Sequence, residues 1–482
     1  MTPVAAAVLG EPRVRRALDA LAATEVRAWL VGGTVRDALL GRPVDDLDVA
    51  VAGSPEPAAR AVARSLGAAV FPLSEAFGAW RVVARDDALQ CDVSPLHGAT
   101  IEEDLGARDF SVNAIALPVG TGDPIDPYGG RTDLAARRLR VLGGPDVERS
   151  AYAADPLRPL RLPRLAAELA FAPDPETERL TREAAPRVAR AAPERVFTEL
   201  RRMLASERAV EGLELAAALG LVDVVLPELA ALRGVEQSHF HHLDVYGHTL
   251  EVLRRAIELE RSLDAIFGEL APALEALLAE PLADDLSRAQ ALRLAALLHD
   301  IGKPATRAVL PNGRVTFIGH DEVGERIAGA ICRRLRTSER LRVFVGAIAR
   351  HHLVLGFMVH ERPLTRAAVY RYLTTCSPVE VEVTLLSCAD RLATRGRRAD
   401  AAIAAHLELA AELMAPALEW RRSGPTRPPV RGDRLARELD LRPGPELGIL
   451  MRALAEAAYT GEASTPDEAI ELARRLLAER IS

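Results

Sequence analysis

The spacing of apolar residues along the chain changes near residue 145. Before that point, short apolar runs predict β-strands at Ala28–Val31 and Leu47–Ala52, and a strand pair at Arg81–Ala84 and Gln90–Val93. A helical pattern, Thr34–Gly41, separates the first two strands. The first part of the chain is therefore expected to be an α/β domain.

Beyond residue 145, apolar residues recur at the i, i+3 and i+4 spacing of amphipathic helices. This spacing predicts helices at Leu160–Leu169, Arg195–Leu204, Gly212–Leu219, Thr249–Leu263 and Leu292–His299. Residues 423–433, SGPTRPPVRGD, are typical of a linker before a last helical segment. The expected architecture is an α/β head followed by a long all-helical body.

Composition and charge exclude several classes of protein. The 482 residues carry a net charge of −7, which excludes a polycationic nucleic-acid coat, and an apolar content of 49% excludes wholesale disorder. No continuous apolar run reaches the roughly 18–20 residues that span a bilayer. The four cysteines lack CxxC spacing, so neither a disulfide framework nor a thiolate metal site is expected. We expect a cytoplasmic protein without a membrane partner.

One region is basic in spite of the acidic total. Residues 131–210 contain 16 arginines and 12 acidic residues, a local net charge of +4. This excess fits either a set of salt-bridged helices or a groove for the phosphates of an RNA.

Residues 29–51, WLVGGTVRDALLGRPVDDLDVAV, join a glycine turn to a pair of aspartates. Gly32 and Gly33 allow the backbone to approach a phosphate, and the helix that follows offers unpaired N–H groups. Alternation along the next strand places Asp46 and Asp48 on one face. Each feature alone is common in turns and loops. Together they predict a two-metal phosphoryl-transfer site, because Mg²⁺ prefers oxygen ligands.

This segment resembles the signature of the class II tRNA nucleotidyltransferase and bacterial poly(A) polymerase family, a branch of the polymerase-β-like nucleotidyltransferases. Further motifs resemble that family in the same order: EEDLGARDFSVNAIAL (102–117), IDPYGGRTDLAARRLRVLG (125–143), DPLRPLRLPRLAAELAF (155–171), ERVFTELRRML (194–204) and GLELAAALGLVDVVLPEL (212–229). The resemblance implies that Asp46 and Asp48 hold two Mg²⁺ ions. It implies contacts to ATP or CTP from Gly32, Gly33, Arg36, Arg108, Asp109 and Asn113.

A third catalytic carboxylate is expected from the strand at residues 90–93. The superfamily usually places one there, and Asp92 is the candidate. The alternative is an aspartate in an ordinary turn, DVSP, and the sequence does not choose between the two.

The helix that resembles the base-reading element departs from the family pattern Glu-Asp-x-x-Arg. Ala154 replaces the glutamate, whereas Asp155 and Arg158 match. These two groups, with Arg161 nearby, are expected to read the Watson–Crick edges of C and A, although Asp155 is equally suited to cap the helix. Pro163 predicts a kink. The nucleotide preference therefore stays open.

Histidines cluster in the second half of the chain, nine of the eleven lying between positions 239 and 360. His299 and Asp300 end an apolar helix, where a neighbouring imidazole and carboxylate can reach one metal ion. Together with His248 and Asp390 they resemble the HD metal-dependent phosphohydrolases. That resemblance implies a divalent metal on His248, His299, Asp300 and Asp390, and these ligands suit Mn²⁺, Ni²⁺, Mg²⁺ or Fe²⁺ alike.

Lys303 is the single lysine of the chain and lies in the same motif, so it is expected to place a positive charge beside a phosphate. His320 and His351 are expected to contact phosphate or to complete a second site, with local hydrogen bonding as the alternative. Surface or supporting positions are expected for His239, His241, His242 and His360.

These resemblances predict a multidomain protein with α/β and all-α parts. We expect a polymerase-β-like nucleotidyltransferase head with a small mixed sheet (1–143), a helical neck that binds RNA (144–232), a helical HD domain (233–420) and a helical tail (421–482).

The implied function is Mg²⁺-dependent, template-independent addition of CMP, CMP and AMP to the 3′ end of tRNA, with a phosphohydrolase centre in the HD domain. One alternative is a half-enzyme that adds only A or only CC, and another is a poly(A) polymerase. A third is a nucleotide or cyclic-phosphate phosphohydrolase whose head only binds RNA. Nothing in the sequence indicates an oligomeric state.

Overall fold

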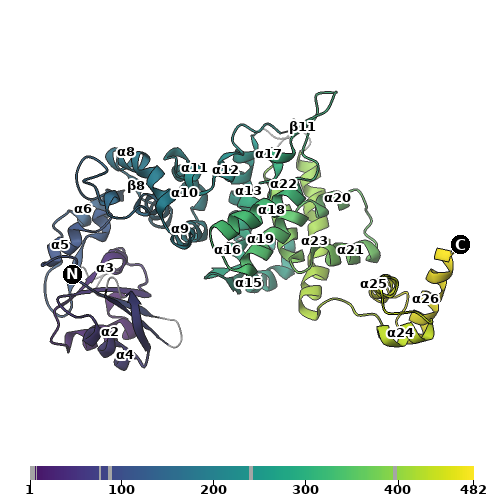
Figure 1. Ribbon diagram of the computed structural model, residues 1–482, viewed down its shortest axis with the longest axis horizontal. Helices are drawn as coiled ribbons and strands as arrows, with labels where there is room; N and C mark the ends of the chain where they lie inside the picture. The colour runs from purple at the N-terminus through teal and green to yellow at the C-terminus, as the bar shows by residue number, and fades with distance from the viewer. Residues whose placement is uncertain are drawn as a thin grey trace. The chain divides into compact units, whose positions relative to one another are not determined.

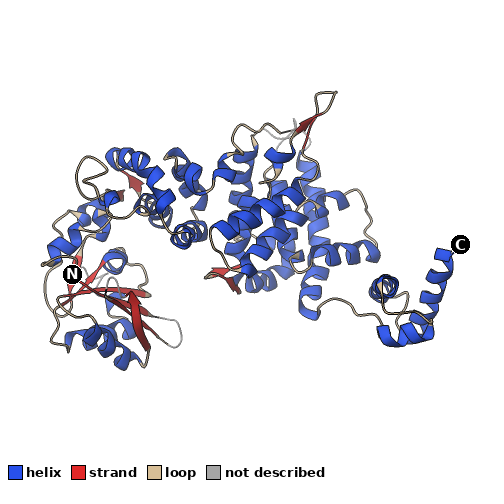
Figure 2. Cartoon of the chain, in the orientation of Figure 1, coloured by secondary structure: helices blue, strands red, loops and turns tan. Residues whose placement is uncertain are grey.

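The computed structural model describes, besides position 6, residues 8–74, 78–84, 89–237, 243–394 and 399–481. The chain separates into unit 1, residues 1–225, and unit 2, residues 226–482 (Figure 1). Unit 1 contains a six-stranded sheet, whereas unit 2 is built from helices with short strand pairs (Figure 2). This arrangement confirms the predicted combination of an α/β head with a helical body.

The sheet of unit 1 has the strand order β3-β4-β5-β2-β1-β6. Its strands are β1 (Ala28–Val31), β2 (Asp46–Val51), β3 (Ala69–Ser74), β4 (Ala79–Val83), β5 (Gln90–Pro95) and β6 (Ala116–Pro118). β2 and β5 run parallel, and every other neighbouring pair is antiparallel. The sheet is therefore mixed, as predicted.

Helices cover both faces of this sheet. α2 (Pro12–Ala22) and α4 (Glu56–Leu66) lie on one side and α3 (Gly32–Leu39) on the other (Figure 1). α4 presents small buried residues such as Ala59 and Val62 to β4 and β5, which allows close packing. The glycine turn after β1 is already the first turn of α3.

The remainder of unit 1 is mainly helical. Its elements are α5 (Ile101–Gly106), η1 (Ser111–Asn113), α6 (Gly130–Ala135), β7 (Arg138–Leu139), η2 (Ala151–Ala153), α7 (Arg158–Leu169), β8 (Ala172–Pro173), α8 (Pro175–Ala184), η3 (Ala185–Arg190), α9 (Pro193–Ala205), α10 (Ala209–Ala218) and α11 (Leu221–Val225). α7 packs against α9 and α10 and continues through Pro163. A buried ion pair between Arg164 and Glu199 joins α7 to α9, so part of the local arginine excess serves packing.

Unit 2 is a bundle in which α13, α16, α19 and α22 pack on one another. Its helices are α12 (Pro227–Ala230), α13 (Val245–Leu259), α14 (Asp264–Phe267), η4 (Gly268–Leu270), α15 (Ala271–Ala279), α16 (Arg288–Leu298), α17 (Lys303–Thr306), α18 (His320–Arg334), α19 (Glu339–His351), α20 (Val354–Met358), α21 (Arg366–Cys376), α22 (Glu380–Leu392), α23 (Ala399–Ser423), α24 (Gly432–Glu438), α25 (Pro445–Thr460) and α26 (Pro466–Ile481). Its short strands are β9 (Pro281–Ala283), β10 (Leu286–Ser287), β11 (Ala308–Val309) and β12 (Val315–Thr316). α16 is buried on all sides from Ala291 to Leu298, which explains its nearly continuous apolar sequence.

The last three helices of unit 2 enclose a small core of their own, which includes Val430, Leu435, Leu450 and Leu454. The segment between α23 and α24 has no regular structure, in agreement with the predicted linker.

Two helical stretches, Glu339–Met358 and Asp400–Ser423, are long and apolar enough to cross a membrane by length and composition. Charged residues interrupt both, so neither forms a continuous apolar run in the sequence. Phe344 in the first and Met414 in the second are buried inside the protein. Buried apolar faces of this kind are what a helical core requires.

Candidate functional sites

The two predicted aspartates lie on β2, where residues alternate between the faces of the sheet. Leu47 and Val49 are buried, whereas Asp46 is exposed and Asp48 is partly exposed, so the two carboxylates share a face as predicted. The parallel register of β2 and β5 places Asp92 directly beside Asp48. Three carboxylates therefore gather on one face of two neighbouring strands.

The glycine turn ends against this group. Gly32 has a φ of +65°, and a Cβ atom there would lie 2.9 Å from Asp48 Oδ2. The Gly33 N–H donates to the Asp48 carboxylate. Thr34 Oγ1 accepts the Asp48 N–H at 2.6 Å and donates to the Asp46 carbonyl oxygen at 3.0 Å. These hydrogen bonds fix the start of α3 to the pair of aspartates.

Electrostatics at this group favour a bound cation. Burial raises the pKa of Asp48; Arg108 opposes this shift, and the charges of Asp92 and Asp46 add to it. Partial desolvation by the surrounding residues and the charge of Asp92 likewise raise the pKa of Asp46. A set of oxygen ligands whose charges oppose one another's ionisation suits a divalent metal such as Mg²⁺.

Four predicted nucleotide-binding residues form a connected chain beside α3. Arg36 Nη1 donates to Asn113 Oδ1 at 2.7 Å, Asn113 Nδ2 donates to Asp109 Oδ1 at 2.9 Å, and Asp109 pairs with Arg161 at 2.8 Å. Burial alone would raise the pKa of Asp109, but Arg161, Asn113 and the Phe110 N–H lower it. Arg36, Asp109 and Asn113 are buried, while Arg161 is partly exposed, and their contact with a nucleotide stays a prediction.

Arg108 is also partly exposed. Its Nη2 pairs with Asp104 Oδ2 at 2.9 Å, and a Cβ atom on Gly32 would lie 2.9 Å from its Nη1. The guanidinium of Arg108 thus lies at the glycine turn and close to the carboxylates, as a phosphate contact requires.

The expected base-reading pair is engaged in internal contacts. Arg158 donates to three backbone carbonyl oxygens, those of Ala107 at 2.7 Å, Ala151 at 2.9 Å and Arg108 at 3.3 Å. Asp155 accepts the Leu157 N–H and pairs with Arg195 of α9 at 2.5 Å. Asp155 therefore caps a turn just ahead of α7, which begins at Arg158 itself.

A second group of side chains lies in unit 2, where the predicted HD residues converge. His248 of α13 contacts Asp390 of α22, with Nε2 and Oδ1 2.9 Å apart, and His299 Nε2 lies 3.2 Å from Asp300 Oδ2. The ligand atoms of His248, His299 and Asp390 all lie within 4.8 Å of one another. Asp300, His320 and His352 form a second such group. All of these side chains except Asp390 are buried.

Three histidines in this cluster share one arrangement that prepares them for metal. The Nδ1 atoms of His299, His320 and His352 contact the carbonyl oxygens of Ala296, Phe317 and Ala349 at 2.7, 2.7 and 2.8 Å. An Nδ1–H that donates to a carbonyl leaves Nε2 with a free lone pair. Among the described residues, none satisfies the buried His299 Nε2 with a hydrogen bond. The donor set therefore fits divalent metal.

Lys303 lies at the edge of this cluster. Its Nζ is 2.6 Å from Asp300 Oδ2 and donates to Gln237 Oε1 at 2.7 Å. Burial alone would raise the pKa of Asp300, but His299, Lys303 and His320 hold it well below its usual range. Lys303 thus compensates the charge of Asp300, whereas contact with a phosphate stays a prediction.

The structure brings His352, not the expected His351, into the cluster. Both residues end α19, and successive helical residues point about 100° apart, so only one of them faces Asp300. His352 Nε2 is 3.6 Å from Asp300 Oδ1. No sequence signal separated the two adjacent histidines. Of the expected outer histidines, His360 is exposed, as predicted, and His239, His241 and His242 lie outside the described residues.

Three family models match successive parts of the chain. Residues 28–140 match the family model "Poly A polymerase head domain", residues 170–232 match "Probable RNA and SrmB- binding site of polymerase A", and residues 245–395 match "HD domain". An A-adding tRNA nucleotidyltransferase of Deinococcus radiodurans is 38% identical over 93% of this chain and 95% of its own length. The chain belongs to the tRNA nucleotidyltransferase family.

Other members of this tRNA nucleotidyltransferase family differ in the nucleotides that their names state. A CC-adding tRNA nucleotidyltransferase of Thermus thermophilus is 37% identical over 92% of either chain. A multifunctional CCA protein of Verminephrobacter eiseniae is 33% identical over 74% of this chain and 81% of its own length. Membership of the family therefore leaves the added nucleotides open.

Solved structures of the family share the fold. A CCA-adding enzyme in complex with ATP has a TM-score of 0.62 at 19% identity and covers 98% of both chains. The Thermotoga maritima CCA-adding enzyme in complex with tRNA has a TM-score of 0.59 at 20% identity, also over 98% of both chains. These likenesses confirm the predicted fold class of this nucleotidyltransferase.

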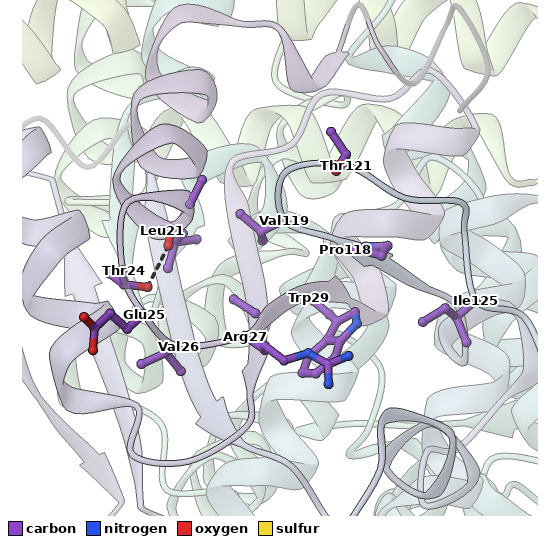
Figure 3. Close-up of a pocket in the computed structure, with 12 residues that line it drawn as sticks. Leu21, Thr24, Glu25, Val26, Arg27, Trp29, Pro118, Val119, Thr121 and Ile125 are labelled. Carbon is purple, nitrogen blue, oxygen red and sulfur yellow. Dashed lines mark hydrogen bonds between the residues drawn. The ribbon is translucent and has the colours of Figure 1, made fainter.

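A cavity of about 430 Å³ lies elsewhere in the head (Figure 3). Its lining includes Arg27, whose guanidinium carbon is 5.2 Å from the centre of the Trp29 ring, as well as Pro118 and Ile125. Trp29 is the second residue of β1, whereas the glycine turn follows Val31, the last residue of that strand. None of the predicted site residues lines this cavity, so it is separate from the carboxylate group.

Proposed function

We propose that this chain adds CMP, CMP and AMP to the 3′ end of tRNA without a template. The observation that supports the proposal is the register that places Asp92 beside Asp48, two residues from Asp46, at the glycine turn. Carboxylates on adjacent strands beside a phosphate-binding turn are the arrangement that two-metal nucleotidyl transfer needs.

In the proposed reaction, the terminal 3′ oxygen of tRNA bonds to the α-phosphorus of CTP or ATP, the bond from that phosphorus to the β-phosphate breaks, and pyrophosphate leaves. Asp46 and Asp48 would hold Mg²⁺, with Asp92 completing the carboxylate set. Mg²⁺ supplies a Lewis acid that favours loss of the hydroxyl proton and stabilises the charge of pyrophosphate. The backbone at Gly32 and Gly33 would surround the triphosphate.

The choice of nucleotide is the least constrained part of the proposal. Asp155 and Arg158 must change partners to read a base, because Arg195 and backbone carbonyls hold them in this structure. Relatives named A-adding and CC-adding are 38% and 37% identical to the chain, so identity does not choose between them. Half-enzymes that add only A or only CC are therefore the alternatives, followed by a poly(A) polymerase.

An incorporation assay separates these functions. tRNA transcripts that end at the discriminator base, at C or at CC are incubated with labelled CTP or ATP supplied singly. CCA addition predicts ordered incorporation that stops after one A. A single A on the CC transcript alone indicates an A-adding enzyme, two C residues without A indicate a CC-adding enzyme, and long A tails indicate a poly(A) polymerase.

The cluster in unit 2 supports a second proposed activity, the hydrolysis of phosphomonoesters or cyclic phosphates. His248, His299, Asp300 and Asp390 would hold a divalent metal, and His320 with His352 offers ligands for a second ion. The test is hydrolysis of 2′,3′-cyclic AMP and p-nitrophenyl phosphate with Mn²⁺, Ni²⁺, Mg²⁺ or Fe²⁺. Absence of hydrolysis with every metal would refute this second activity and leave the cluster with a role in stability alone. Hydrolysis without nucleotide incorporation would favour the phosphohydrolase alternative.

The proposed partners are tRNA, ATP and CTP. Related solved structures contain tRNA, an ATP analogue or CTP, which supports this part of the proposal. A cytoplasmic location without a membrane partner stays a prediction.

A further inference from the structure

Asp92 has a partner that lies outside the sequence motifs. Arg81 of β4 stands directly opposite Asp92 in the antiparallel register of β4 and β5. Arg81 Nε donates to Asp92 Oδ1 at 2.8 Å, and Arg81 Nη2 donates to Asp92 Oδ2 at 2.7 Å. Both carboxylate oxygens are therefore held by one planar guanidinium, the most directional way to orient a carboxylate.

The arginine lies on the face that carries the other carboxylates. The neighbouring residue, Trp80, faces α4, because the guanidinium carbon of Arg60 lies 5.3 Å from the centre of its ring. Successive residues of a strand point to opposite faces, so Arg81 points to the side of α3. Arg81, Asp92 and Asp48 consequently form a row across three adjacent strands.

This row matters because Asp92 is only partly buried, with 26% of its side chain exposed. Without Arg81, its carboxylate would be free to rotate in solvent, and the charges of Asp46 and Asp48 would push it away from the metal position. The fork of Arg81 occupies one lone pair on each oxygen and leaves others directed along the face. The guanidinium thus fixes the plane of the carboxylate and still permits a metal contact.

We propose that Arg81 is a positioning residue for nucleotidyl transfer, which orients Asp92 as the third carboxylate of the site. This inference rests on the proposed transferase function. Arg81 itself would not touch the reacting atoms. Its removal should therefore slow the chemical step and leave the binding of nucleotide and tRNA nearly unchanged.

The test compares R81M, which keeps the aliphatic length, with R81K, which keeps the charge but loses the fork. R60M is the matched control, because Arg60 stacks on the same strand from the opposite face. Single-turnover incorporation of CMP into tRNA should slow about 10–100-fold in R81M, the usual cost of losing a residue that orients a metal ligand. The KM for CTP should change less than the rate, R81K should recover part of it, and R60M should match the wild type.

The same measurement in a D92N background decides whether Arg81 acts through Asp92. The inference requires R81M/D92N to be no slower than D92N alone. Equal slowing by R81M in both backgrounds would overturn it, as would a wild-type rate in R81M or an equal loss in R60M. Wild-type protein that incorporates no nucleotide into any tRNA transcript would instead refute the transferase function itself. Thermal unfolding of each variant identifies any loss of folded protein.

Discussion

The imidazoles of His320 and His352 approach each other through their Nε2 atoms, which lie 3.2 Å apart. In each ring the other nitrogen, Nδ1, contacts a carbonyl oxygen three residues earlier in the chain. If both Nδ1 atoms carry the hydrogen, two lone pairs point at each other across this gap, beside the carboxylate of Asp300. Such a pair is stable only with a proton or a metal ion between or beside the two nitrogens.

This relationship predicts that His352, and not its neighbour His351, takes part in metal binding. His352→Ala should lower the affinity for Mn²⁺ or Ni²⁺ and slow phosphate-ester hydrolysis by about 10–100-fold, the range typical for residues around a metal. Isothermal titration with each metal and hydrolysis assays measure both effects. His351→Ala is the matched control and should behave as the wild type; an equal loss in both variants would contradict the assignment.

Asp48→Asn should abolish transfer and stabilise the metal-free protein. The pKa of Asp48 is raised in the folded state, so its stabilising effect is present below its unfolded value of 3.8 and is lost as the pH rises through the folded pKa. The ionised side chain is thus a cost at neutral pH, which asparagine removes, raising stability by about 1 kcal/mol. Calorimetry at pH 7 with EDTA checks this. Mg²⁺ should raise the melting temperature of the wild type more than that of the variant, which keeps only the cluster of unit 2; a less stable Asn variant would contradict the prediction.

Gly32→Ala should slow incorporation while the protein remains folded. The methyl group would come 2.9 Å from Asp48 Oδ2 at a φ of +65°, so the carboxylate or the turn must shift. A displacement of about 1 Å at the reacting groups costs about 100-fold in rate. Single-turnover kinetics measures the loss. Gly53→Ala is a control for strain alone, since Gly53 also has a positive φ but no atom within 4 Å of the position that its added methyl group would take.

Asp109→Asn should reduce stability more at neutral pH than in acid. The folded pKa of Asp109 is lowered, so its ionised form contributes stability above the unfolded value of 3.8, and that contribution is lost as the pH falls through the folded pKa. The loss at pH 7 should be about 2 kcal/mol, typical of a hydrogen bond to a charged group. Urea unfolding at pH 7 and pH 3 gives the comparison. A difference between wild type and variant that is larger at pH 3 would contradict the sign.

The two residues expected to read the base should respond differently to truncation. Arg158→Ala leaves the carbonyl oxygens of Ala107, Arg108 and Ala151 without their donor, so it should lower stability by about 2 kcal/mol as well as activity. Asp155→Ala loses an ion pair with the exposed Arg195 and the acceptor of one N–H, that of Leu157, so it should lower stability less than Arg158→Ala and should change mainly the ratio of CMP to AMP incorporation. Thermal unfolding and single-nucleotide assays separate the effects. Equal destabilisation by both variants would contradict this distinction.

The strands and aspartates near the glycine turn could be predicted because local pattern and chemistry agree there. The apolar run Ala28–Val31 is β1 with the predicted bounds, and alternation correctly placed Asp46 and Asp48 on one face. The role of Asp92 could not be decided, because it depends on the parallel pairing of β2 with β5, a long-range contact without a local signal.

Boundaries and short elements were less predictable. The helix predicted at Thr249–Leu263 corresponds to α13, which ends at Leu259. The prediction ran too far because the apolar residues beyond Leu259 keep the helical spacing although the helix has ended. The short strand β6 has three residues, too few for alternation to be read. His352 was missed for a similar reason, since only the packing of α19 decides which of two adjacent imidazoles points inward.

The parallel pairing of β2 and β5 has a consequence for how this protein tolerates change. Between Val51, the last residue of β2, and Gln90, the first residue of β5, the chain forms α4, β3 and β4, and this excursion separates in sequence carboxylates that are neighbours in space. Lengthening a loop within that excursion leaves their spacing intact, whereas a slip of one residue in either strand would turn an acidic group to the opposite side. Insertions there would thus change the loops between the two strands and preserve the arrangement of Asp46, Asp48 and Asp92.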